Sequence, residues 1–262
     1  MPLSPPEKES IQKVIAGTLR AKFRNYTPTQ QSAMPFHTRL LGKDRMALFS
    51  FIQSLNTTFG TVIYEPVAVE LAKRKFQTAK KGEQLGHKIT NEAQDAIRKI
   101  MNELGEASRD ACQKSEMEEI RKVCRQGNTE HVTLRQADIY LVDENGWHYP
   151  IDIKTAKPNI DGYEKYKETL LKWTAVILYK DPHANVGAML GIPYNPNHPK
   201  PYKHWTVRGM VEKDTQLKVG DSFWDFLAGE PVYDDLLTCF EVVGVAMRQE
   251  IDNYFAQFNT HQ

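Results

Sequence analysis

The sequence predicts an α/β protein with a mixed β-sheet flanked by helices, and three features of the chain lead to that prediction. Residues 132–142 and 147–154 alternate apolar and polar side chains, and Asn145-Gly146 between them is a strong hairpin signal. A helical pattern over 162–180 then leads to an apolar run over 186–193, which fits a central strand reached by a crossover. Most of the remaining chain has helical periodicity.

The N-terminal part, residues 1–128, is expected to be mainly helical. Pro6 suits the first turn of a helix, whereas Pro28 and Pro35 predict a loop over 25–43, and Gly60 predicts a break. Apolar residues at a spacing near 3.6 define the helices between these signals. In order, the expected helices cover 6–24, 45–55, 62–76 (or a start just after Pro66), 89–104 and a segment ending near residue 124.

Beyond the central strand, the sequence predicts a proline-rich loop followed by further regular structure. Residues 205–211 are expected to form a strand, and residues 223–227 a short buried helix that ends at Gly229. An apolar stripe over 232–258 predicts a long C-terminal helix. We therefore expect a single domain over residues 1–262, with residues 129–212 as its catalytic sheet core.

Composition restricts the class of protein. The chain has 262 residues, of which 40% are hydrophobic, and a net charge of +1, so a uniformly basic DNA-binding protein is excluded. Basic residues are nevertheless concentrated over 73–88 and acidic ones after residue 212. No apolar run approaches the roughly 18 residues of a membrane span, and the N-terminus lacks a signal-peptide core. A cytoplasmic protein with no membrane partner is expected.

Three charged residues of the predicted hairpin form the candidate active site. Strand residues two apart share a face, so Asp152 and Lys154 point to the same side of the second strand. Asp138 lies on the first strand, on the face opposite to its buried neighbours. If the strands pair, two carboxylates and one ammonium group converge at one edge of the sheet.

This set of groups suits metal-assisted hydrolysis of a phosphodiester. Asp138 and Asp152 can hold Mg²⁺, a hard cation that binds through carboxylates and waters, and the backbone carbonyl of Ile153 can add a ligand. Lys154 can orient the attacking water or offset the charge that develops on phosphorus. The simpler alternative is an ion pair without catalytic function, because Asp-x-Lys alone occurs by chance in many proteins.

Asp138 and Asp152-Ile153-Lys154 resemble the core motif of the PD-(D/E)xK nuclease superfamily, although Ala137 stands where the motif has proline. Longer stretches resemble the TdeIII-type family of type II restriction endonucleases: SLNTTFGTVIYEPVA, QADIYL, DIKTAKPN, LLKW, IPYNP, PKPY, VGDSFWDFLAGE and YDDLL. The resemblance implies a restriction-endonuclease-like core in a homodimeric, Mg²⁺-dependent enzyme. It implies double-stranded DNA as the substrate and a GGNCC-type site; separately, we expect no organic cofactor.

Further residues are candidates for the same site. Glu65 matches the glutamate of the family-like stretch and is a candidate third acid; a surface or capping role is the alternative. Loops on rigid strands commonly carry recognition, so Lys157 and Asn159 are candidate DNA contacts, as is Gln136 at the active edge. In the proline-rich loop, Lys200 and Lys203 are candidates for phosphate contacts, although that loop can equally be a rigid surface connection.

Three other functions stay open from the sequence alone. A repair or structure-specific nuclease would share the same core, and an inert DNA-binding module could retain the fold. The intact set of Asp138, Asp152 and Lys154 argues against the inert module. A glycosidase-like acid–base pair is disfavoured, because an adjacent ammonium group lowers a carboxyl pKa where acid catalysis needs it raised.

Overall fold

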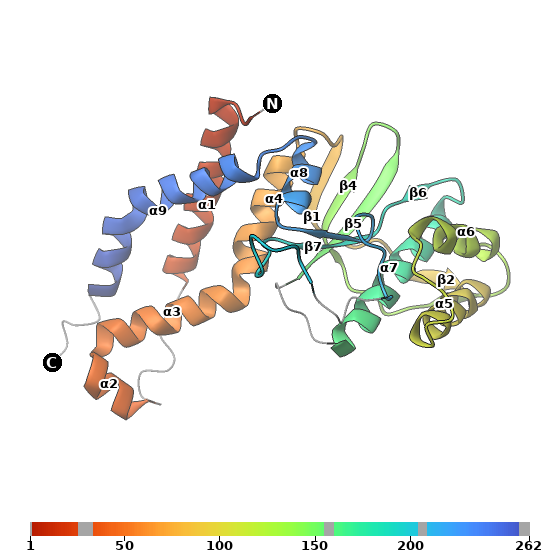
Figure 1. Cartoon of the computed structure of the whole chain (residues 1–262), viewed down its shortest axis with the longest axis horizontal. Helices are drawn as coiled ribbons and strands as arrows, with labels where there is room; N and C mark the ends of the chain where they lie inside the picture. The colour runs from red at the N-terminus through yellow and green to blue at the C-terminus, as the bar shows by residue number, and fades with distance from the viewer. Residues whose placement is uncertain (1, 26–33, 155–159, 204–208, 257–262) are drawn as a thin grey trace. The chain divides into compact units, whose positions relative to one another are not determined.

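The computed structural model describes residues 2–25, 34–154, 160–203 and 209–256 (Figure 1). The chain divides into two compact units. The helical unit consists of Met1–Glu70 together with Val232–Gln262, and the sheet unit consists of Leu71–Pro231. The helical unit therefore combines a segment that precedes the sheet unit in the sequence with one that follows it.

The helical unit is held together by aromatic side chains. Phe23 stacks on Phe51, with 4.8 Å between the ring centroids, and both rings meet the edge of Phe255. These residues bring three helices together, and Figure 1 shows α1 beside α9. The helical elements are α1 (Pro5–Arg24), α2 (Pro35–Leu41), α3 (Lys43–Phe59), the π-helical turn η2 (Gly60–Tyr64), α4 (Glu65–Ala72), whose last two residues belong to the sheet unit, and α9 (Tyr233–Ala256).

Helices α1, α3 and α9 confirm the periodicity seen in the sequence, but two predictions for this unit are wrong. Part of the loop expected over 25–43 is the helix α2, because Pro35 occupies a first-turn position where its missing N–H costs nothing. The break expected at Gly60 is a π-helical turn that joins α3 to α4. Among the described residues, no single helix is long and apolar enough to span a membrane. The pair formed by α3 and the η2–α4 stretch, which is bent by 69°, is long and apolar enough by length and composition only.

The sheet unit contains the predicted mixed sheet. Its strand order is β1-β4-β5-β7-β8, with β6 also paired to β5. The pairs β1–β4 and β4–β5 are antiparallel, whereas β5–β7 and β7–β8 are parallel. The strands are β1 (Thr78–Glu83), β2 (Lys88–Thr90), β3 (Thr129–His131), β4 (Ala137–Val142), β5 (Trp147–Ile153), β6 (Asn185–Val186), β7 (Met189–Ile192) and β8 (Leu217–Val219); the helices are α5 (Asn91–Gly105), α6 (Gln113–Val123), α7 (Ile160–Lys180) and α8 (Asp221–Ala228).

The hairpin between β4 and β5 forms where the sequence predicts it. Gly146 has a φ of +75°, but Asn145 does not adopt positive φ, so the turn differs from the two-residue type. Instead, the N–H of Asp143 donates to the carbonyl of Trp147, and the Asp143 carboxylate accepts from the N–H groups of Asn145 and Trp147. A three-residue turn that ends in a left-handed glycine has this form.

The sequence analysis did not predict the strands at the two edges of the sheet. The strand β1 has the sequence TAKKGE, which is too polar to resemble a strand, yet it pairs with β4 along its length. The strand expected over 205–211 lies partly outside the described residues, and residues 209–211 are not in a strand. The edge beyond β7 is formed by β8 instead.

Helices pack on the sheet through two separate sets of apolar side chains. Helices α5, α6 and α7 share one buried cluster with residues of β4 and β7, and Trp173 of α7 is fully buried in it. Tyr149 of β5 instead packs against Phe76 and Phe226. Position 191 of β7 must be a glycine, because a Cβ at this position would lie 2.4 Å from the ring of Phe223.

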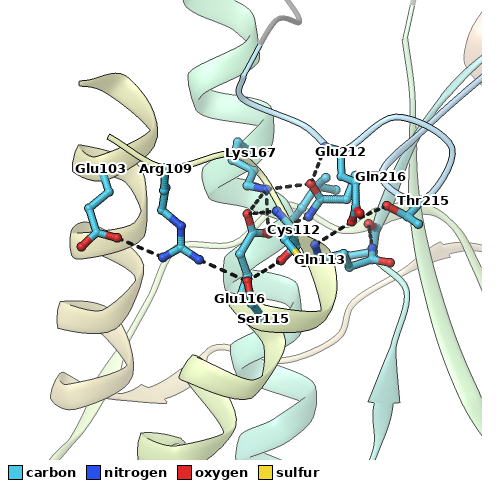
Figure 2. Close-up of polar contacts among 12 residues, drawn as sticks. Glu103, Arg109, Cys112, Gln113, Ser115, Glu116, Lys167, Glu212, Thr215 and Gln216 are labelled. Carbon is cyan, nitrogen blue, oxygen red and sulfur yellow. Dashed lines mark hydrogen bonds and ion pairs between the residues drawn. The ribbon is translucent and has the colours of Figure 1, made fainter. Parts of the chain in front are cut away.

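A buried polar network ties α6 and α7 to the segment that leads into β8 (Figure 2). The Nζ atom of Lys167, which has no exposed surface, lies 2.6 and 2.7 Å from the two carboxylate oxygens of Glu116. It also donates to the amide oxygen of Gln216 at 2.7 Å, and the Gln216 amide nitrogen donates back to Glu116. Burial lowers the pKa of Lys167, and the nearby Glu116 opposes that shift. All three side chains are paired, which is the condition under which buried charge is tolerated.

We expect Lys167→Met to destabilise the protein by about 3–5 kcal/mol, because it leaves the Glu116 carboxylate buried without its cation. Urea unfolding of the purified variant measures the loss. Lys165→Met, an exposed position on the same helix, is the matched control and should change the free energy of unfolding by less than about 0.5 kcal/mol. Adding Glu116→Gln to Lys167→Met should recover part of the loss; equal stability of Lys167→Met and wild type would contradict the network's role.

Candidate active site

The pairing of β4 with β5 determines where the two candidate carboxylates lie. Ile139 is paired with Ile151 in the antiparallel ladder, so one step further along the register places Asp138 opposite Asp152. Directly opposed residues of two strands have Cβ atoms about 4.5–5.5 Å apart. The backbone N–H of Ile153 donates to Asp138 Oδ2 at 2.7 Å, which fixes that carboxylate against the neighbouring strand. The structure thus brings Asp138 and Asp152 together as the sequence predicts.

Asp152 is buried, with 1% of its surface exposed, and its two oxygens have different surroundings. Oδ1 accepts from Lys154 Nζ at 2.6 Å and lies 3.1 Å from a guanidinium nitrogen of Arg135. Oδ2 is also buried but has no hydrogen-bond partner among the described residues. A buried carboxylate oxygen without a partner is costly unless something else binds it.

The protonation of Asp152 follows from this environment. Burial raises its pKa from 3.8 to about 6, because a buried carboxylate loses the hydration of its charged form. The ammonium of Lys154 lowers the pKa, the Asp138 carboxylate raises it, and Arg135 lowers it. Burial is the largest of these effects, so the group titrates near neutral pH.

Lys154 is fixed on both its backbone and its side chain. Its N–H donates to the carbonyl of Gly191 in β7 at 2.9 Å, immediately after β5 ends. Its Nζ atom bonds Asp152 and lies 4.7 Å from the centre of the Tyr166 ring on α7. An ammonium over an aromatic face is attracted by the ring electrons. Burial and the nearby Asp152 carboxylate both raise the pKa of Tyr166.

Sequence reasoning missed two residues of this site, Arg135 and Tyr166. One guanidinium nitrogen of Arg135 lies 3.1 Å from Asp152 Oδ1 and 3.4 Å from Asp138 Oδ1. The alternation of side chains along a strand cannot place Arg135 at this site, because residues 132–136 are not in a strand. Arg135 is also an odd number of residues from Asp138, which by alternation would put the two on opposite faces. Tyr166 lies on α7, and the helical pattern over 162–180 does not distinguish it from the other residues of that helix.

The remaining sequence candidates come from several parts of the chain. Gln136 is exposed, and its amide lies beside Gly82 of β1. Lys200 and Lys203 are exposed in the segment after β7. Lys157 and Asn159 lie outside the described residues. Glu65 is buried at the first position of α4, in the helical unit.

The chemistry of the donor set suits a hard divalent cation. Carboxylate oxygens are the ligands that Mg²⁺ prefers, and Asp152 Oδ2 is a buried oxygen for which the described residues provide no donor. The described residues contain no cluster of three or more Asp, Glu, His or Cys side chains arranged for a metal. A cation at Asp138 and Asp152 would therefore need further ligands, such as waters, a backbone carbonyl or substrate oxygens.

The mixed sheet with its helical crossover has the architecture of the restriction-endonuclease-like class, as the sequence predicts. A family model described as type II restriction endonuclease, HinfI, matches residues 5–244. The chain is also 27% identical over 261 residues to the type II restriction enzyme MjaII of Methanocaldococcus jannaschii, covering 88% of this chain and 68% of that enzyme.

The chain belongs to the HinfI family of type II restriction endonucleases. It is thus a site-specific deoxyribonuclease that acts on double-stranded DNA, and enzymes of this type generally use a divalent metal ion. The type II assignment made from the sequence is confirmed. The narrower TdeIII-type resemblance stays a prediction.

We expect the concentration of divalent metal ion for half-maximal cleavage to be about tenfold higher at pH 5 than at pH 7.5. Burial holds the pKa of Asp152 at about 6, so at pH 5 the carboxyl carries a proton that must leave before a cation binds. Initial cleavage rates across a Mg²⁺ titration at each pH, at constant ionic strength, measure the shift. A circular dichroism spectrum at pH 5 checks that the fold persists, and an unchanged Mg²⁺ midpoint would contradict the role of Asp152.

Proposed function

We propose that this restriction endonuclease is a Mg²⁺-dependent homodimer that acts in the cytoplasm. In this proposal it cuts double-stranded DNA at a GGNCC-type palindrome and leaves 5′-phosphate ends. The observation that carries the proposal is the carboxylate pair beside Lys154, with a buried Asp152 oxygen that no described residue binds. The site sequence, and the closer kinship with the TdeIII-type group that suggests it, rest on the resemblance of the longer sequence stretches.

In this proposal Asp138, Asp152 and the carbonyl of Ile153 hold the ion. Bound Mg²⁺ supplies Lewis acidity and lowers the pKa of a coordinated water. The ionised form of Asp152 is required, because its Oδ1 atom holds Lys154 and its Oδ2 atom is available to the cation. Lys154 then presents an ammonium group, fixed by Asp152 and Tyr166, to the attacking water or to the phosphate.

We also propose which residues contact DNA away from the cleaved bond. Gln136 comes just before one active-site strand in the sequence, and Lys157 and Asn159 come just after the other, which suits contacts to bases. Lys200 and Lys203 are exposed cations that suit phosphates. Glu65 is proposed as a further catalytic acid, and this proposal rests on the resemblance of its sequence stretch alone.

Digestion of plasmid DNA tests the enzyme's specificity and metal dependence together. We expect discrete fragments with Mg²⁺, run-off sequencing that places every cut at GGNCC, and no cutting in excess EDTA. Asp152→Ala should abolish cleavage and Lys154→Ala should slow it by about 10²–10⁴-fold. Discrete fragments cut at another sequence would overturn only the GGNCC assignment, whereas cutting in EDTA or a wild-type rate for Lys154→Ala would refute the proposed chemistry.

The homodimer follows from matching one active site per chain to a palindromic site with a two-fold axis. Light scattering at micromolar concentration, with and without a duplex that carries the mapped site, should give twice the mass of the chain for the protein component. A monomer under both conditions would rule out the symmetric arrangement.

A further inference from the structure

Arg135 is the one cation that contacts both candidate carboxylates in the described part of the chain, and its main chain is firmly anchored. It lies two residues before β4, outside any strand. The indole N–H of Trp173, which is fully buried in α7, donates to the carbonyl of Arg135 at 3.0 Å. The side chain of Arg135 therefore starts from a backbone position held by the helix that crosses the sheet.

The guanidinium group of Arg135 is placed at the border between the buried carboxylates and solvent. Its side chain is 45% exposed, whereas that of Asp152 is 1% exposed. Both contacts with carboxylates use the same nitrogen, Nη2. Within the described residues, Nη1 and Nε donate to no other group, so the two N–H donors of Nη1, which lies away from the Nε–Nη2 edge, remain available for a ligand.

Charge makes a phosphodiester the ligand that fits the Nη1 group of Arg135. A DNA phosphate that approaches Asp138 and Asp152 is repelled by two carboxylates unless cations lie between them. Lys154 is only 13% exposed and is already held by Asp152 and the ring of Tyr166. Arg135 is the more exposed cation, and a hydrogen bond from its charged Nη1 group to a phosphate oxygen is stronger than one between neutral groups.

We propose that Arg135 binds the phosphodiester that the enzyme cleaves, donating from Nη1 to a non-bridging oxygen while Nη2 stays on the carboxylates. This inference rests on the proposed function and adds a substrate-binding residue to that site. Arg135 then has two effects. It holds Asp138 and Asp152 in position, and it replaces repulsion at the cleaved phosphate by attraction.

The competing explanation is that Arg135 contacts only the carboxylates and has no contact with DNA. Both explanations predict slower cleavage when Arg135 is removed, so cleavage alone cannot separate them. Binding to DNA with and without charge at a single phosphate can. A methylphosphonate removes the negative charge of that phosphate and leaves the rest of the duplex unchanged.

The test is a four-way comparison of binding affinity in EDTA, where no metal takes part. Wild type and Arg135→Ala are each titrated with two duplexes, one natural and one with a methylphosphonate at the bond that run-off sequencing identifies as cut. We expect Arg135→Ala to bind the natural duplex about tenfold more weakly than wild type, the effect of losing a charge-assisted hydrogen bond. The two proteins should bind the methylphosphonate duplex equally, within about twofold.

Two further variants sharpen the comparison. Arg98→Ala is the matched control, because Arg98 is an exposed arginine of α5 that also pairs with an aspartate three residues away, Asp95. It should behave as wild type on both duplexes. Arg135→Lys keeps the charge but has one nitrogen in place of the separate Nη2 and Nη1 groups, so it should recover only part of the affinity for the natural duplex. If Arg135→Ala lowers the unfolding midpoint, the affinities of Arg135→Lys and wild type for the two duplexes are compared instead.

The outcomes separate this inference from the proposed function. Equal loss of affinity on both duplexes, or no loss on the natural one, overturns the assignment of Arg135 to the phosphate. If wild type gives no cut site in any duplex, the proposed function itself fails. If wild type cuts and the affinity losses differ between the duplexes as expected, both stand.

Discussion

The antiparallel pairing of β4 with β5 is the constraint on which the rest of the site depends. It sets Asp138 opposite Asp152, directs the N–H of Ile153 to the Asp138 carboxylate, and leaves Lys154 at the end of β5 beside β7. A slip of one residue would move a strand's side chains to the other face of the sheet. The Asp143–Gly146 turn prevents that slip, because its side-chain and backbone hydrogen bonds permit one loop length.

Two groups of buried charge in the sheet unit serve opposite purposes. In the Lys167 network, every charged atom of Glu116 and Lys167 has a partner, so the network joins helices and binds nothing further. At the active site, Asp152 has one saturated oxygen and one without a described partner, and its pKa is raised by burial. The difference in saturation, and not burial itself, distinguishes a structural ion pair from a group that can take up a ligand.

Sequence periodicity was sufficient where a segment's own side chains determine its structure. The alternation in β4 and β5 located Asp138, Asp152 and Lys154 on one face, and the stripes of α1, α5, α7 and α9 located those helices. Periodicity failed where a neighbouring strand determines the structure. The polar segment β1 is a strand because its backbone pairs with β4. The short strand β8 is likewise defined by its pairing with β7 in the main sheet path. Arg135 was missed for a related reason, since its position depends on Trp173, 38 residues away.

The division of the chain into units has a consequence for the order in which the protein is made. Domains generally fold as units while the chain is synthesised from its N-terminus. The whole sheet unit, Leu71–Pro231, is complete before α9 exists, whereas α1 and α3 must wait for Phe255 of α9 to cover Phe23 and Phe51. During translation the ribosome therefore carries an enzyme whose carboxylate pair can already be assembled while its helical unit still exposes an aromatic core.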